Sequence, residues 1–366
     1  MTIALLSVAR QHGRPRVPVA RGNGGQIEYP RRMRVLLLVP LFLLCLPAGA
    51  QDTLYAKARA AYDTQQWDEA AALFEQAEQD SPGATDALLL ESRSLLRLGR
   101  LQEAEKAVGR YLVRHPDSPD ALYTLGMVQQ REDRPRDSLL TMTHAAQLRT
   151  PNSEDLRIVG LDYVLLNDYP DAIHWLEKAV EFDGKNAEAW YALGRADYTQ
   201  SRFREAEHAF QQVLMLEPGH LRATENLGLV YSMENRMAEA EQTFRKAVAL
   251  ADKDPHTDEW PYLNYGGFLL DQGRPSEAVP LLERSAAINP KCASCQEKLG
   301  RALSAAGRLG EGVQHLEMAV ALAPEEAHLH YELGLALRKA GMEDRARQEF
   351  ALAQKQYGTK TAGEPK

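Results

Sequence analysis

The chain repeats itself every 34 residues from Gln51 onward. Nine successive repeats align in this register, and they start at residues 51, 85, 119, 153, 187, 221, 259, 293 and 327. A fixed period of this length is typical of architectures in which each repeat is one supersecondary unit that buries its apolar face against its neighbours. The period therefore predicts an extended stack of similar units rather than one compact core.

Three positions of the repeat indicate how its parts pack. Position 8 is always small: Ala58, Ser92, Gly126, Gly160, Gly194, Gly228, Gly266, Gly300 and Gly334. Position 20 is also small: Ala70, Ala104, Ser138, Ala172, Ala206, Ala240, Ala278, Gly312 and Ala346. Position 24 is large and apolar: Phe74, Val108, Met142, Leu176, Phe210, Phe244, Leu282, Leu316 and Phe350. A glycine inside a helix costs about 1 kcal/mol relative to alanine, so the glycines at position 8 indicate a close crossing of two helices.

The clearest repeat runs from Ala187 to His220. Its positions 4, 7, 8, 20, 24 and 32 hold Trp190, Leu193, Gly194, Ala206, Phe210 and Pro218. This pattern resembles the tetratricopeptide repeat (TPR) family, and the resemblance extends from Gln51 to the last helix. It implies an all-α, right-handed superhelical solenoid of about nine helix-turn-helix units. We expect the TPR array over residues 51–357 and a polar tail over residues 358–366.

Two departures from the pattern are informative. Position 7 is charged in the first two repeats, where Lys57 and Glu91 stand, and we expect both to face water as terminal repeats do. Four extra residues, Pro255 to Asp258, precede the seventh repeat. They are interpreted as a tolerated surface loop. The alternative is an acidic lip beside a binding groove, formed by Asp252, Asp254, Asp258 and Glu259.

Residues 33–50 have the layout of a secretory signal peptide. The apolar stretch from Val35 to Leu46 follows three arginines and precedes Ala48-Gly49-Ala50, an A-x-A cleavage site. The stretch is too short for a stable bilayer span. We therefore expect cleavage after Ala50, an exported protein that is periplasmic or secreted, and no stable membrane span in the mature chain.

Residues 1–32 lack helical periodicity, and we expect them to be disordered. They are an upstream extension if translation starts at Met1, or a mis-called start if it begins at Met33. The pair Arg31-Arg32 also resembles a twin-arginine export signal, although the apolar residues that usually follow that signal are missing. Lipid attachment at Cys45 is disfavoured by the large Leu44 before it.

Removal of the leader makes the chain more acidic. The whole chain has 43 basic and 51 acidic residues, and residues 1–50 hold seven of the basic and one of the acidic ones. The remaining 36 and 50 correspond to a net charge of −14. Because nucleic-acid binders usually carry a basic face or tail, this balance disfavours a nucleic-acid partner.

The mature chain keeps two cysteines, Cys292 and Cys295, in a C-x-x-C spacing. Residues so spaced near a helix start can form a disulfide, and an exported protein meets oxidising conditions. We predict a local structural disulfide. A redox-active pair is the alternative, since a helix N-terminus lowers thiolate pKa, but the sequence lacks a thioredoxin-like context.

The sequence contains no recognisable catalytic motif, phosphate-binding loop or metal-ligand pattern. The nearest histidine pair, His328 and His330, is spaced i, i+2 and so points to different helix faces. We therefore predict that the protein is not an enzyme and needs no cofactor or metal.

The resemblance implies that first helices line a concave groove through positions 2, 5, 6, 9, 12 and 13. The predicted partner-binding residues are Tyr191, Arg195, Tyr198, Asn226, Asn264, Lys298 and Arg301. Asn226 and Asn264 share position 6, where an amide can both donate to and accept from a peptide backbone. Lys298 and Arg301 would hold an acidic side chain or a C-terminal carboxylate. The alternative interpretation is an ordinary hydrated surface.

These features predict a protein-protein interaction scaffold of the bacterial cell envelope that binds a peptide or a partner protein. The alternative hypothesis is a structural subunit of an envelope assembly or export machine for outer-membrane proteins or polysaccharide. Because no separate capping helix follows the ninth repeat, end-to-end self-association is a further hypothesis.

The leader generates the first testable prediction. Mass spectrometry of the exported protein should find Gln51 as its first residue, because the cleavage site and the start of the repeat register coincide. A mature protein that retains residues 33–50 would contradict this prediction.

Overall fold

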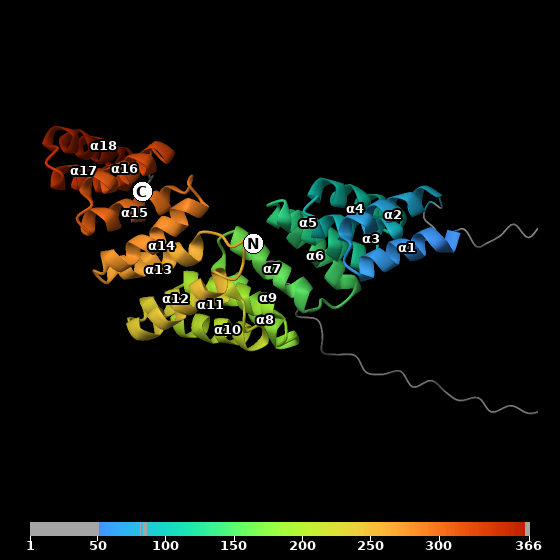
Figure 1. Cartoon of the computed structure of the whole chain (residues 1–366). Helices are drawn as coiled ribbons and strands as arrows, with labels where there is room; N and C mark the ends of the chain where they lie inside the picture. The colour runs from blue at the N-terminus through green and yellow to red at the C-terminus, as the bar shows by residue number, and fades with distance from the viewer. Residues whose placement is uncertain (1–50, 81, 83–85, 363–366) are drawn as a thin grey trace, which may run out of the picture. The chain divides into compact units, whose positions relative to one another are not determined.

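The computed structural model describes residues 51–80, 82 and 86–362 (Figure 1). These residues form α-helices and no strand, so the all-α prediction is confirmed. The predictions for the leader lie outside the described residues. The helices are Gln51–Asp63 (α1), Trp67–Asp80 (α2), Ala87–Arg97 (α3), Leu101–Arg114 (α4), Pro119–Arg131 (α5), Pro135–Leu148 (α6), Ser153–Leu165 (α7), Tyr169–Phe182 (α8), Ala187–Thr199 (α9), Phe203–Leu216 (α10), Leu221–Met233 (α11), Met237–Ala251 (α12), Trp260–Asp271 (α13), Pro275–Ile288 (α14), Ala293–Ala305 (α15), Leu309–Leu322 (α16), Ala327–Lys339 (α17) and Glu343–Ala362 (α18).

The chain divides into two compact units, Met1–Thr150 and Pro151–Lys366. Within each unit every helix packs against the next one, and the first helices of successive repeats also contact each other. In the second unit the first helices are α7, α9, α11, α13, α15 and α17. We call the side of these helices formed by repeat positions 2, 5, 6, 9, 12 and 13 the inner face. The regular period did not predict a division after Thr150.

The turn between the two helices of each repeat uses one left-handed residue. In every repeat this residue stands at position 15, with φ between 58° and 87°: Gln65, Gly99, Asp133, Asn167, Ser201, Asn235, Gly273, Gly307 and Gly341. Left-handed backbone suits glycine and is tolerated by asparagine and aspartate. The shared conformation reverses the chain at the same point in each repeat, so the second helices start in register.

The close crossing expected at position 8 is present, and its main partner is the side chain at position 24. A Cβ added to Gly194 would lie 2.8 Å from Cε1 of Phe210, and a Cβ added to Gly228 would lie 2.8 Å from Cε1 of Phe244. Both phenylalanines are almost fully buried. The missing side chain thus provides the space that the aromatic ring fills.

The backbone carbonyl group of the residue at position 20 lies at the same helix crossing. In the second repeat the Ser92 hydroxyl donates a hydrogen bond to the Ala104 carbonyl at 2.8 Å. In the eighth repeat a Cβ on Gly300 would meet the Gly312 carbonyl oxygen at 2.8 Å. Small residues at positions 8 and 20 therefore let the two helix backbones come together, as predicted.

The prediction for Glu91 is wrong. Lys57 faces water, but Glu91 is only 8% exposed. Its side chain lines a pocket with residues of α2 and α4, such as Ala71 and Ala107, because the first repeat covers the second. Burial, and then the nearby carboxylate of Glu75, raise the pKa of Glu91 to about 7.

Arginines at position 16 connect successive repeats by ion pairs. These arginines pair with carboxylates of the preceding repeat, and the pairs are Arg134–Glu105 at 2.7 Å, Arg202–Glu177 at 3.7 Å, Arg236–Glu207 at 2.7 Å, Arg274–Glu241 at 2.8 Å and Arg308–Glu283 at 3.2 Å. Because the partners are partly exposed, each pair contributes roughly 0–1 kcal/mol. We therefore expect these recurring ion pairs to matter more for the alignment of neighbouring repeats than for the stability of the fold.

The last helix is longer than the repeat pattern predicts. α18 continues to Ala362, so the predicted polar tail of residues 358–366 begins inside a helix. Ala346 and Ala353 of α18 are buried, whereas Leu352 is exposed.

The crossing generates a prediction about stability. Gly194→Ala should lower the free energy of unfolding by about 1–3 kcal/mol, because its Cβ would overlap the Phe210 ring. The matched control is Gly109→Ala, in the middle of α4, where an added Cβ meets no atom within 4 Å. That control should raise stability by up to about 1 kcal/mol. Urea unfolding measures both changes, and equal effects of the two substitutions would contradict the crossing.

Candidate functional site

Two predicted residues, Tyr191 and Arg195, line a pocket between α7 and α9. The pocket has a volume of about 250 Å³, and Arg157, Leu161 and Glu188 also contribute to it. All five hold inner-face positions of the repeat. The first helices thus form a recess between the side chains that the sequence pattern selects.

The two arginines of this pocket differ in whether a carboxylate of the protein neutralises their charge. Arg157 is mostly buried and pairs with Glu154 at 2.6 Å. Arg195 is exposed, and its guanidinium forms no ion pair or hydrogen bond with the residues that the structure describes. Its five donors are therefore available to a carboxylate or another acceptor.

Asn226 of α11 extends the same face. Its Nδ2 donates to the Tyr191 hydroxyl at 3.3 Å and to the Arg222 carbonyl at 2.7 Å. Tyr191 itself packs beside Phe210 and His220, and burial raises the pKa of its hydroxyl. Both amide hydrogens of Asn226 have internal partners, so its carbonyl oxygen is the group left to accept a peptide N–H.

Asn264 of α13 faces a buried carboxyl group. Its Nδ2 donates to Glu225 Oε1 at 3.4 Å. Glu225 is only 4% exposed, and burial, followed by the negative charge of Asp258, raises the pKa of its carboxyl to about 7, while Arg222 opposes this change. Asn226 and Asn264 thus differ, because Asn226 donates to a tyrosine hydroxyl and a backbone carbonyl, whereas Asn264 donates to a carboxyl group.

The other two predicted cations are not equivalent. Arg301 of α15 lies 3.1 Å from Glu297 and 3.7 Å from Glu332, so carboxylates of its own and the next repeat already neutralise it. The side chain of Lys298 packs against α13. A Cβ atom added to Gly267 of α13 would lie 3.2 Å from Lys298 Nζ. Lys298 has no ion pair within the described part of the chain, so it is the free cation of the predicted pair.

Tyr198 has a packing role. Its ring meets Phe203 edge to face with centroids 5.8 Å apart, and burial raises the pKa of its hydroxyl. This aromatic pair joins the end of α9 to the start of α10.

The four carboxylates of the acidic-lip alternative each make an internal contact, although Asp252 and Asp254 remain exposed. Asp258 pairs with Arg222 at 2.5 Å, and Asp252 accepts a hydrogen bond from the Tyr262 hydroxyl at 2.7 Å. Asp254 accepts from the His256 amide at 2.9 Å, and Glu259 accepts from the Asn289 side chain at 2.8 Å. Asp258 therefore ties the insertion to α11, and the other three carboxylates already accept hydrogen bonds beside it.

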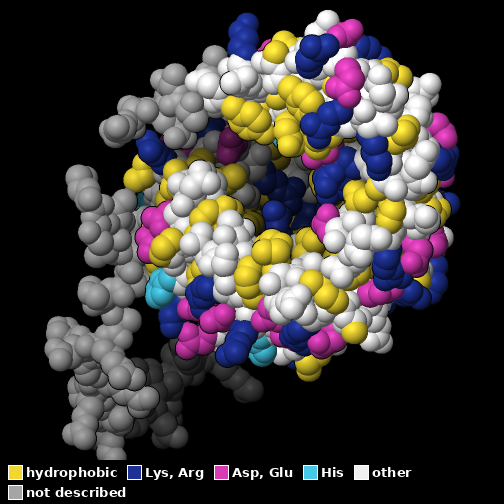
Figure 2. Space-filling view, turned by 90° about the vertical axis from the view of Figure 1, so that its left-hand side faces the viewer, with side chains coloured by type: hydrophobic (Ala, Val, Ile, Leu, Met, Phe, Trp, Pro, Cys, Tyr) yellow, Lys and Arg dark blue, Asp and Glu magenta, His cyan; other side chains and the backbone are white. Residues whose placement is uncertain are grey.

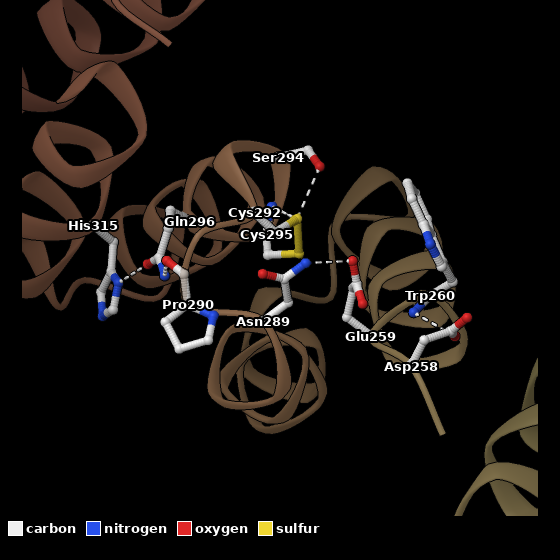
Figure 3. The surroundings of a disulfide bond; sticks show 10 residues. All are labelled: Asp258, Glu259, Trp260, Asn289, Pro290, Cys292, Ser294, Cys295, Gln296 and His315. Atoms are coloured by element: carbon white, nitrogen blue, oxygen red, sulfur yellow. Dashed lines mark hydrogen bonds between the residues drawn. A yellow bond between two sulfur atoms is a disulfide. The ribbon is translucent and has the colours of Figure 1, made fainter. Parts of the chain in front are cut away.

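Cys292 and Cys295 form a disulfide at the start of α15, and their Cα atoms are 5.2 Å apart (Figure 3). A carboxylate oxygen of Glu259 and the two sulfur atoms lie within 4.8 Å of one another. Because the sulfurs are bonded to each other, they do not offer thiolate ligands to a metal in this state.

Sequence reasoning missed Arg157, the burial of Glu225 and the partners of Arg301. The first two occupy position 5, so the inward-facing pattern could have identified them. The pairing of Arg301 with Glu332 connects two repeats, and the spacing within one repeat carries no signal for it.

The surface around α17 and α18 mixes acidic, basic and hydrophobic side chains (Figure 2). No helix within residues 51–80 and 86–362 is both long and apolar enough to cross a membrane.

The buried carboxyl of Glu225 generates a pH prediction. Its folded pKa of about 7 exceeds the ordinary value of 4.5, so the folded state binds the proton more tightly than the unfolded chain. As the pH rises from about 4.5 to about 7, the unfolded chain has lost this proton while the folded state still holds it. The free energy of unfolding therefore falls across this range. Glu225→Gln should be more stable than the wild type at pH 8 by about 1–3 kcal/mol, and this gain should shrink at pH 5.

The matched control for this prediction is Glu217→Gln, at an exposed position, which should change stability by less than about 0.5 kcal/mol. Urea unfolding at pH 5 and pH 8 measures the difference. A gain for Glu225→Gln that is equal at both pH values would contradict the assignment.

Family models match most of the repeat region. Models for the tetratricopeptide repeat match residues 55–121, 89–134, 191–255 and 269–330, and one for the TPR repeat matches residues 160–201. Together these ranges cover more than half of the chain.

Among curated proteins, the chain is similar to a probable UDP-N-acetylglucosamine–peptide N-acetylglucosaminyltransferase, SPINDLY, from Arabidopsis thaliana. The two are 30% identical over 82 residues, which are 22% of this chain and 9% of that protein. The chain spans less than a tenth of the length of the curated relatives that it matches.

Two solved structures resemble the fold. The APC/C hetero-tetramer Cut9–Hcn1 matches with a TM-score of 0.55 and 14% identity, over 84% of this chain and 61% of that chain. PilW, a type IV pilus biogenesis factor, matches with a TM-score of 0.52 and 24% identity, over 56% of this chain and 94% of that chain. These likenesses show the fold alone. Together with the repeat models and the all-α architecture, they establish that the chain belongs to the tetratricopeptide repeat family.

Proposed function

We propose that the protein is a non-enzymatic interaction scaffold of the bacterial cell envelope, and that the inner face of its second compact unit binds a peptide or partner protein. The observation that carries this proposal is the guanidinium of Arg195, which lies beside the pocket of α7 and α9 and has no ion pair with the described part of the chain. An exposed cation that no internal carboxylate satisfies is a ready contact for an acidic group.

The ligand class follows from the polar groups of the inner face. Arg195 and Lys298 supply positive charge without an internal ion pair among the described residues. Asn226 supplies a carbonyl oxygen for a backbone N–H. Leu161 and Tyr191 supply apolar surface in the same pocket as Arg195. This combination fits an extended peptide segment that carries an acidic side chain or a C-terminal carboxylate.

The envelope location rests on the leader sequence. A positively charged segment, an apolar stretch and an A-x-A site precede the repeats, as in secreted proteins. The disulfide of Cys292 and Cys295 is consistent with an oxidising compartment. The alternative, a structural subunit of an envelope assembly, would use outer surfaces of the repeats instead of Arg195.

A charge reversal tests the proposal. The protein is used to capture partners from envelope extract, and the affinity of each captured partner is then measured by fluorescence anisotropy. Arg195→Glu should raise Kd by at least about tenfold, because it replaces an attractive contact by a repulsive one. Asn226→Ala combined with Asn264→Ala should weaken the same complex.

The matched control is Arg204→Glu, which makes the same charge change at an exposed position of α10. It should leave Kd within about twofold of the wild type. Equal Kd values for the wild type and Arg195→Glu would contradict binding at this pocket, and would favour the assembly hypothesis if the partner is still captured.

A further inference from the structure

The disulfide at the start of α15 joins one accessible sulfur to one buried sulfur. Cys292 is partly exposed, whereas Cys295 is fully buried. A thiol that approaches from outside can therefore reach Cys292 Sγ and not Cys295 Sγ. Thiol-disulfide exchange needs this kind of access to one sulfur.

The disulfide contributes little to the stability of the fold. A disulfide stabilises a fold mainly by restricting the unfolded chain, and the effect grows with the length of the loop that it closes. Cys292 and Cys295 are three residues apart, and the first turn of α15 already holds them near each other. A disulfide between residues far apart in the sequence would restrict the unfolded chain far more.

Polar groups around Cys292 favour its thiolate. The Cys295 backbone N–H donates to Cys292 Sγ at 3.1 Å, and the Ser294 hydroxyl lies 3.3 Å from the same sulfur (Figure 3). Cys292 is also the N-cap of α15, where the positive end of the helix dipole lies. N–H donors and a helix N-terminus both lower the pKa of a thiol, which stabilises the reduced form of this sulfur.

A carboxylate stands beside both sulfurs. Glu259 is held in this place by the hydrogen bond from Asn289 at 2.8 Å, and its oxygen lies within 4.8 Å of each sulfur. Its negative charge opposes a thiolate on either sulfur, and at Cys292 the Cys295 N–H and the Ser294 hydroxyl offset this effect. Because burial disfavours a charged thiolate, the buried sulfur leaves as a neutral thiol that takes its proton from the solvent.

A pocket of about 420 Å³ opens next to Cys292. Trp260, which is 43% exposed, and Leu329 give it apolar surface, while Glu297 and His328 give it polar groups. A recess of this size accepts a short peptide segment. A cysteine in such a segment would be brought to the accessible sulfur of the disulfide.

We propose that the Cys292–Cys295 disulfide is exchange-active and oxidises a dithiol in a partner protein. A partner thiolate attacks Cys292 Sγ, the bond between the two protein sulfurs breaks, and Cys295 takes the electron pair and a proton. The second partner thiol then loses its proton and attacks the partner sulfur of the mixed disulfide, which releases Cys292 as a thiolate. The partner gains a disulfide, and its two electrons reduce Cys292 and Cys295.

Dithiothreitol serves as the dithiol probe for the native wild-type protein without denaturant. Free thiols are alkylated with iodoacetamide and assigned by mass spectrometry, while circular dichroism reports the fold. The expected result is reduction of Cys292 and Cys295 at an unchanged helix content. Reduction that occurs only when urea unfolds the chain would overturn the proposal.

A pair of variants tests which sulfur is attacked. Cys295→Ser leaves Cys292 as the sole thiol of the mature chain, and Cys292→Ser leaves Cys295. With oxidised glutathione, the folded Cys295→Ser protein should form its mixed disulfide at least about tenfold faster than Cys292→Ser. Equal rates in the two folded variants would contradict the proposal. If either variant fails to fold, the dithiothreitol experiment on the wild-type protein still tests it.

Discussion

The contact between repeat positions 8 and 24 is the interaction on which the other features of each repeat depend. Where position 8 is glycine, as in Gly194, the ring of a residue such as Phe210 occupies the space of the missing side chain. This contact sets the separation of the two helices of a repeat. The first helices then meet their neighbours, and residues such as Tyr191 and Arg195 come to share one face. A local packing constraint, repeated along the chain, thus places the candidate site.

The parts of the fold that depend on contacts within one repeat could be predicted from the sequence. The helix pair and the small residues at positions 8 and 20 follow from local spacing, because the same side chains meet in every repeat. Contacts between repeats could not be predicted in this way. The burial of Glu91 and the neutralisation of Arg301 by Glu332 depend on how one repeat covers the next. The left-handed conformation of Ser201 is likewise set by the turn geometry and not by a glycine.

The distinction between paired and unpaired charges refines the candidate site. Sequence position alone makes Arg195, Lys298 and Arg301 equivalent cations of a groove. The structure separates them, because Arg301 lies within ion-pair distance of two carboxylates, while Arg195 forms no ion pair with the described residues. The same reasoning weakens the acidic lip, since its carboxylates stabilise the insertion. The disulfide of Cys292 and Cys295 joins residues only three positions apart, and this short span is one of the observations behind the proposed exchange chemistry.

The central claim is that each repeat is stabilised by its own helix crossing and by its nearest neighbours. Native-state hydrogen exchange of the whole protein tests it most directly within residues 151–362. We predict that amides of interior helices such as α11 and α12 exchange most slowly, and that protection falls toward α18, which among the described helices packs only against α17. Uniform protection from α7 to α18, or slower exchange in α18 than in α11, would contradict this claim.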